Sequence, residues 1–116
     1  MAIPSGSGTE VLNRAVAEGM NATTTTLLTV PTDHIYTILS IILFNPNNDS
    51  KEFSIVFVAG GSTTMNITGD NGHPIPANST FTWNDKFVMR PADILKIYTD
   101  CTAGDCIVSY IDQDWT

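Results

Sequence analysis

The side chains best suited to nucleophilic or metal chemistry in this 116-residue chain are two cysteines and two histidines. Cys101 and Cys106 are separated by four residues, so they can flank a hairpin tip, either as surface-loop thiols or as a disulfide. Two thiolates do not complete the four-ligand shell of a structural zinc site. Because His34 and His73 are distant in the sequence and have no ligand-like spacing, we expect no metal ion and no cofactor.

The acidic residues lie in predicted turns rather than in a pattern that indicates catalysis. Aspartate caps and solubilises turns, and six aspartates fit that role: Asp33, Asp49, Asp70, Asp85, Asp93 and Asp105. A glycosidase needs two carboxyl groups that converge in a cleft, and no nucleophile elbow, P-loop, zinc-protease or dinucleotide-binding motif is present. We therefore predict that the protein is not an enzyme, and a small hydrolase ranks third among the alternatives.

The charge balance argues against two classes of partner. Twelve acidic residues against five basic ones give a net charge of −7. A nucleic-acid-binding protein needs a positive surface, and anionic membranes attract basic segments rather than acidic ones. No apolar run is long enough to span a membrane, and the first twenty residues lack the apolar core of a signal peptide. We expect neither nucleic acid nor membrane as a partner.

The strand predicted over residues 34–44, HIYTILSIILF, organises the rest of the chain. It is rich in β-branched and aromatic residues, which suit a pleated sheet. Simple alternation divides it into two faces, and both are largely apolar. We expect another part of the chain or another subunit to cover the second face. The first face would carry Ile35, Thr37, Leu39, Ile41 and Leu43, and the second His34, Tyr36, Ile38, Ser40, Ile42 and Phe44.

Short alternating segments separated by turn residues predict an all-β fold. We expect about seven or eight strands in a single antiparallel, jelly-roll-like β-sandwich that comprises residues 23–116. In the second half, Phe87, Met89, Leu95 and Ile97 should point inward, and Lys96 outward. The predicted strands are 23–30, 34–44, 53–59, 63–68, 81–83, 86–90, 94–99 and 107–111.

Residues 1–22 have the features of an N-terminal arm outside the sandwich. Pro4, Gly6 and Gly8 interrupt regular structure, and the segment after them can form a short helix or lie extended. A solvated tail would have little reason to carry Val11, Leu12 and Val16. An arm that docks on a neighbouring subunit is therefore as consistent with the sequence as a plain tail. The residues we predict at interfaces are Val11, Leu12, Val16, Tyr36, Ile38, Ile42, Phe44 and Trp115.

Several stretches of the chain together resemble one group of known proteins. They are MAIPSGSGTEVLNRA, VPTDHIYTILSIILFN, IPANSTFTWNDKFVMRPADILKIYTD and the closing VSYIDQDWT. They resemble small β-sandwich virion structural proteins of tailed bacteriophages, marine ones especially, and the resemblance covers most of the chain. The I-P-A-x-S-T, W-N-D-K and A-D-x-L-K rhythm is distinctive of the group, whereas the Cys101–Cys106 segment departs from it.

The resemblance implies a non-enzymatic virion protein that is assembled in the host cytoplasm. Its first-ranked role is a capsid decoration or cement subunit that binds and stabilises the major capsid protein lattice. By analogy with decoration proteins on local threefold axes, a homotrimer is the expected oligomer. The alternative is a tail or head-fibre component that binds a host-surface receptor or carbohydrate, for which Trp83 beside Asn84 and Asp85 is a candidate contact.

Overall fold

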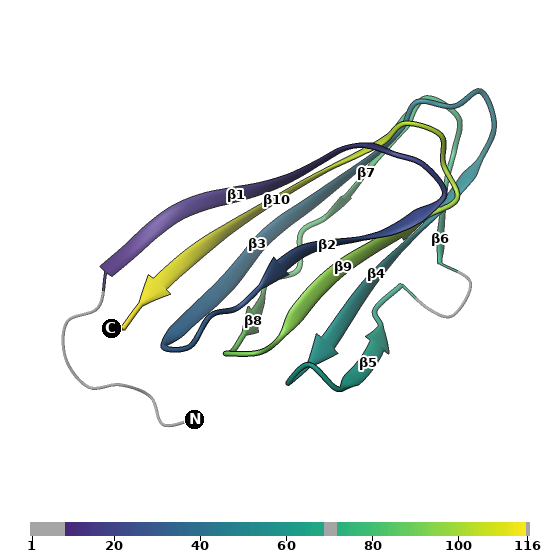
Figure 1. The fold of residues 1–116 in the computed structure, drawn as a ribbon. Helices are drawn as coiled ribbons and strands as arrows, with labels where there is room; N and C mark the ends of the chain where they lie inside the picture. Colours follow the sequence, from purple (N-terminus) through teal and green to yellow (C-terminus); the bar gives the residue numbers. More distant parts are fainter. Residues whose placement is uncertain (1–8, 69–71, 116) are drawn as a thin grey trace.

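Two antiparallel sheets face each other in the computed structural model, which describes residues 9–68 and 72–115 (Figure 1). The first sheet consists of β1 (Thr9–Met20), β10 (Gly104–Asp114), β3 (His34–Asn45), β7 (Ser79–Trp83) and β8 (Phe87–Met89), the last two both paired with β3. The second consists of β2 (Thr23–Thr29), β9 (Ile94–Thr99), β4 (Lys51–Ala59), β5 (Thr63–Asn66) and β6 (His73–Ile75), the last two both paired with β4.

The order of strands is that of a jelly roll. Strands that follow one another along the chain, such as β1 and β2 or β3 and β4, belong to opposite sheets. The predicted antiparallel β-sandwich is therefore confirmed, with ten strands in the described residues rather than seven or eight. Among these residues, no helix is long and apolar enough to cross a membrane.

The core lies between the sheets and is filled by aliphatic and aromatic side chains. As predicted, Leu95 and Ile97 of β9 are fully buried, while Lys96 between them points outward and is only half-buried. Met89 is also buried, and Phe87 packs against the core. The largest side chains with almost no exposed surface include Phe53 and Ile55 of β4, Ile38, Ile41 and Leu43 of β3, and Val108 of β10.

A β-bulge in the middle of β3 corrects the predicted faces of this strand. Ser40 pairs with Ser109 and Ile38 pairs with Tyr110, so Leu39 is an extra residue without a partner on β10. An extra residue shifts the alternation, and every later side chain changes face. Residues that simple alternation places on opposite faces consequently share the inner one: Tyr36, Ile38, Ile41, Leu43 and Asn45 are all buried.

The segment predicted as an N-terminal arm is largely a strand of the sandwich. From Thr9 to Ala17, β1 pairs with β10 without a break, and Ala17 and Met20 are buried in the core. The extended form of this segment is thus the observed one, and a boundary after residue 22 does not separate an arm from the sandwich. Residues 1–8 of the predicted arm lie outside the described part of the chain.

Both cysteines are buried free thiols, which corrects their placement in a surface loop. The Cys106 side chain points into the core between Ala17 and Leu43, its partners on the flanking strands, and burial raises its pKa to about 12. Cys101 lies against polar groups: its Sγ is 3.4 Å from Oδ1 of Asn45 and 3.3 Å from Oδ1 of Asn47. The two thiols therefore have different surroundings.

Replacing each cysteine with serine should therefore give different results. The hydroxyl of Cys101→Ser can donate to the same asparagine oxygens, so we expect a change of at most about 1 kcal/mol in the free energy of unfolding. In Cys106→Ser the hydroxyl is buried where the thiol has no hydrogen bond in the described structure, and the expected loss is about 1–3 kcal/mol. Urea denaturation under reducing conditions measures both values. Equal losses would contradict this assignment.

Candidate interaction surface

The outer face of the first sheet carries two apolar rows that run across its strands. Antiparallel partners place their side chains on the same face, so the register defines each row. One row contains Val16 on β1, Ile107 on β10 and Ile42 on β3. The other starts at Leu12 and continues through Ile111 and Thr37 to Val88 on β8. Between the two rows lie the polar side chains Arg14, Ser109 and Ser40.

These apolar side chains are exposed or half-buried within the described chain. Leu12 is 75% exposed, Val16 54% and Ile107 38%. Ile35 and Phe44 on β3 face the same side, half-buried between their neighbours. An open hollow of about 530 Å³ lies where the bulged Leu39 approaches Leu12, Arg14 and Ser109. Exposed apolar surface of this kind usually marks an interface.

The outer face of the second sheet is different, because polar residues separate its apolar ones and its aliphatic side chains are half-buried or buried. On β9, Lys96 and Tyr98 alternate with the buried Leu95 and Ile97. Tyr98 pairs with Thr24 and Ser54, and Lys96 pairs with Thr26 and Val56, beyond which lies Asn66. Ile94 and Val58 form an apolar pair on the same face. The sandwich is therefore two-sided, with an apolar outer surface on the β1–β10–β3 sheet.

The predicted interface residues divide between this surface and the core. Leu12, Val16, Ile42 and Phe44 lie on the apolar outer face, and the exposed Val11 lies on β1. The prediction of Tyr36 and Ile38 as interface residues is wrong, because before the bulge the even-numbered side chains of β3 point into the core, where both are buried. Trp115 is half-buried, and its backbone N–H donates to the carbonyl of Asp33. Its indole Nε1 is buried without a hydrogen-bond partner in the described structure.

Sequence reasoning missed the contribution of β10 and β8 to this surface. Ile107 and Ile111 alternate with the buried Val108 and Tyr110, so the β10 segment is apolar on both faces, as β3 is. Two neighbouring strands with this property are a signal that could have identified the outer face. Val88 gives a weaker signal, because a single valine between Phe87 and Met89 reads as part of a buried run.

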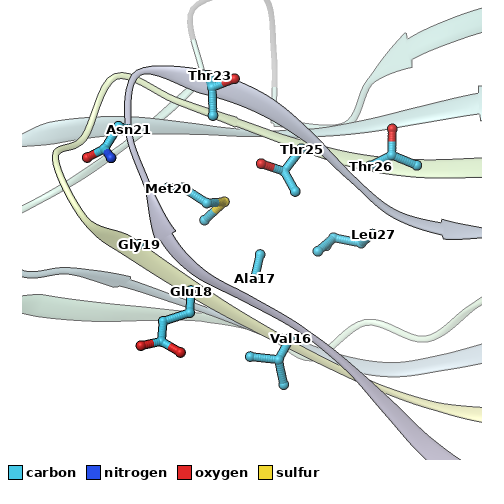
Figure 2. A pocket seen from close by; sticks show the side chains of 10 residues that line it. All are labelled: Val16, Ala17, Glu18, Gly19, Met20, Asn21, Thr23, Thr25, Thr26 and Leu27. Carbon is cyan, nitrogen blue, oxygen red and sulfur yellow. The ribbon is translucent and has the colours of Figure 1, made fainter.

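Two other hollows lie along the open sides of the sandwich. One of them, of about 450 Å³, lies beside the turn that joins β1 to β2. In Figure 2, Ala17, Met20 and Leu27 lie there among threonine side chains, and Glu18 points away. The second, of about 280 Å³, is almost wholly apolar and includes Phe57, Met65, Trp83 and Phe87. The indole N–H of Trp83 donates to the carbonyl of Asp85 at 2.8 Å. The aromatic ring of Trp83 is therefore the part of this side chain that lines the hollow.

A cluster of titratable side chains lies where β3 begins and β10 ends. Nδ1 of His34 is 2.8 Å from Oδ1 of Asp112, and Nε2 is 3.6 Å from Oδ1 of Asp114. The hydrogen bond to Asp112 raises the pKa of His34; burial opposes that rise, and the charges of Asp112, Asp114 and Asp33 add to it. In the described residues, no group of three or more His, Cys, Asp or Glu side chains is placed to hold a metal ion.

This cluster makes part of the stability dependent on pH. Because folding raises the pKa of His34 above 6.5, its stabilising contribution is complete below that pH and is lost as the pH rises through the raised pKa. We expect Asp112→Asn to lower the pKa of His34, as followed by NMR titration of the imidazole carbon-bound protons. Asp85→Asn, in an exposed turn, should leave it unchanged. An unaltered His34 titration in Asp112→Asn would contradict the role of the hydrogen bond.

Comparison with solved structures gives matches that include the following two, both with TM-scores below 0.5. No protein-family model and no curated protein matches the chain. One structure is of Bacillus endospore appendages, described as a family of disulfide-linked pili: it has a TM-score of 0.49 and 18% identity, and the match covers 98% of this chain and 95% of that one. The other is of infectious bursal disease virus strain Gx, with a TM-score of 0.46 and 12% identity over 94% of this chain and 37% of that one.

Proposed function

We propose that this chain is a non-enzymatic structural protein of a bacteriophage virion, a decoration or cement subunit that binds the major capsid protein lattice. The observation that carries the proposal is the apolar outer face of the β1–β10–β3 sheet. One row extends across three strands, from Val16 to Ile42, and the other across four, from Leu12 to Val88. An exposed apolar surface on the outside of a sheet suits attachment to another protein surface.

The architecture supports a cement role in a second way. Because the exposed aliphatic side chains Leu12, Val16 and Ile107 lie on one outer face, a subunit can attach by the first sheet and leave the second, with Lys96 and Tyr98, toward solvent. The sequence resemblance to virion structural proteins points to the same class of partner. A homotrimer stays our first choice of oligomer on the capsid, and Trp115 stays a predicted interface residue.

A matched pair of substitutions tests this function. Ile107 and Tyr98 lie on central strands and are similarly exposed, 38% and 41%, but on opposite outer faces. Both Ile107→Lys and Tyr98→Lys should fold, since exposed substitutions usually change stability by no more than about 0.5 kcal/mol. We expect Ile107→Lys to disappear from purified virions while Tyr98→Lys keeps its wild-type copy number, as measured by quantitative mass spectrometry. Wild-type incorporation of Ile107→Lys would refute the proposal.

The second candidate is a tail or head-fibre component that binds a receptor or carbohydrate. The observation in its favour is the apolar hollow at Trp83, because sugars stack on exposed aromatic rings. Copy number distinguishes the two functions: hundreds of copies per virion support the capsid role, and a few copies support the fibre role. In the fibre case, binding to a glycan array should occur with the wild type and be lost in Trp83→Ala.

A further inference from the structure

The first strand presents an edge that no other described strand covers. β1 lies at the end of its sheet and pairs on one side only, with β10. Nine consecutive residues, Thr9 to Ala17, keep a regular register there. In Figure 1 the first half of β1 extends away from β2. A long regular edge of this kind is a template for pairing with another strand.

The hydrogen bond made by the backbone N–H of Arg14 shows which residues of β1 direct their backbone groups to this free edge. In an antiparallel ladder, alternate residues direct their N–H and C=O groups to opposite sides of the strand. The N–H of Arg14 bonds to Oδ1 of its neighbour Asn13, at 2.8 Å, instead of to β10. Glu10, Leu12 and Arg14 therefore direct their backbone groups to the free edge. A second strand at this edge can replace the exposed side-chain acceptor with a backbone carbonyl.

The same three residues form a self-complementary pattern on the outer face. Reading every second residue along β1 gives Glu10, Leu12 and Arg14. When an identical strand lies antiparallel with Leu12 opposite Leu12, Glu10 of each copy faces Arg14 of the other. Opposite charges directly across a strand pair are stabilising, and like charges are destabilising. In the described residues, none of the ion pairs within the chain involves Glu10 or Arg14.

Alternative registers are less favourable. Centring the pair on Arg14 places the two arginines opposite each other and Glu10 opposite Glu18. Centring it on Val16 would pair Arg14 with Glu18, but the register of β1 shifts between Ala17 and Met20, and Gly19 has a φ of 64°. Figure 2 shows Glu18 near the end of β1, where the chain bends toward the turn that leads into β2. Of these three registers, the one centred on Leu12 both places opposite charges across from each other and keeps those charges in the regular part of the edge.

We propose that two copies of this chain pair through the free edges of β1, antiparallel and about a twofold axis at Leu12. The first sheets of the two copies then form one continuous sheet. Leu12, the most exposed large apolar side chain in the described structure at 75%, packs against Leu12 of the second copy. The backbone pairing uses the strand edge and leaves the rest of the outer face assigned to the capsid open; Leu12, at the end of one row of that face, lies at both surfaces. The pairing also joins two such faces, which strengthens attachment through effective concentration.

Cysteine cross-linking tests both the contact and its register. Cα atoms of a hydrogen-bonded antiparallel pair are about 5.5 Å apart, a distance that a disulfide bridges. Leu12→Cys should therefore form a covalent dimer under oxidised glutathione, seen on a non-reducing gel. The two Val16 positions would be eight residues apart along the paired strands, roughly 27 Å, so Val16→Cys should stay monomeric on the same gel. Cys101 and Cys106 are buried and do not interfere.

Charge reversal gives a second, independent measurement. Arg14→Glu places like charges opposite each other, and we expect the dissociation constant from sedimentation velocity to rise at least tenfold. The double variant Glu10→Arg/Arg14→Glu restores both opposite-charge pairs and should return to near the wild-type value. In the register centred on Val16, residue 14 faces Glu18, so adding Glu10→Arg to Arg14→Glu would not restore an opposite-charge pair. Failure of Leu12→Cys to cross-link in a folded protein, equal cross-linking of Val16→Cys, or absence of rescue in the double variant would overturn the proposal.

Discussion

A chain that lacks residues 1–20 is expected to lose its cooperative unfolding transition, whereas a chain that lacks only residues 1–8 should melt as the intact protein does. The longer deletion removes β1 and exposes the β10 edge along its whole length. It also removes Ala17 and Met20 from the core, where they are 7% and 4% exposed. Because the deletion takes away an entire sheet edge, the fold should not survive it.

The expected size of this loss follows from the buried side chains alone. Truncating one buried methionine to alanine costs about 2–5 kcal/mol, and a domain of this size has roughly 5–15 kcal/mol in total. Losing the β1 ladder and uncovering Cys106 and Val108 of β10 adds to that cost.

Circular dichroism during heating measures the outcome, and the deletion of residues 1–8 is the control because it leaves β1 complete. If the chain without residues 1–20 melts at the wild-type temperature, then β1 contributes nothing to the stability of the sandwich, and its place in the first sheet has to be revised. Aggregation of the longer deletion alone would agree with an exposed β10 edge.

The parts of this fold that sequence reasoning predicts are those with clear local signals. β9 alternates between apolar and polar residues, and Leu95, Lys96 and Ile97 lie as that alternation requires. Turn residues delimit β3 and β4 at nearly the observed positions. For such segments, the side-chain pattern and the tertiary packing agree, so the pattern is sufficient.

The bulge at Leu39 could not be predicted in this way. The odd-numbered and the even-numbered residues of β3 are both largely apolar, so the sequence does not show where the inward-facing set changes from one to the other. The position of the bulge depends on the partner strand β10, on which Ser109 pairs with Ser40 and Tyr110 pairs with Ile38. That pairing is a long-range property, and the assignment of Tyr36 and Ile38 to an interface failed for this reason.

The interpretation of β1 as an arm is wrong for a related reason. An edge strand has one neighbour, and the first six residues of β1 are all exposed. A sequence of exposed residues after a Pro/Gly/Ser-rich start has the same composition whether it is a solvated tail or a sheet edge. What distinguishes a sheet edge from a tail is the set of ten paired positions on β10, from Thr9 with Asp114 to Met20 with Gly104, which lie far apart in the sequence. Leu12 and Val16, which lie exposed on the outer face, stay predicted interface residues, because exposed aliphatic side chains are unusual in a tail.

Asn45→Ala should destabilise the fold more than either cysteine substitution does. Asn45 closes β3 and has no exposed surface. Its amide nitrogen donates to the carbonyl oxygens of Asp49 at 2.9 Å, Ile75 at 2.9 Å and Pro76 at 3.2 Å. Its Oδ1 accepts from the N–H of Asn47 at 2.9 Å and contacts Cys101 Sγ. One side chain thus connects β3, the β3–β4 turn, the end of β6 and the β9–β10 turn.

Removing this amide leaves buried backbone groups without partners, and each such group costs about 1–3 kcal/mol. We expect Asn45→Ala to lower the free energy of unfolding by about 3–5 kcal/mol, and Asn45→Asp by a similar amount, because a carboxylate accepts from Asn47 but cannot donate to the three carbonyls. The exposed Asn84→Ala is the matched control and should change it by no more than about 0.5 kcal/mol. Urea denaturation of the three variants gives these values directly. A loss below about 1 kcal/mol for Asn45→Ala would mean that water replaces the amide, and that the turns around β3 are held together by other contacts.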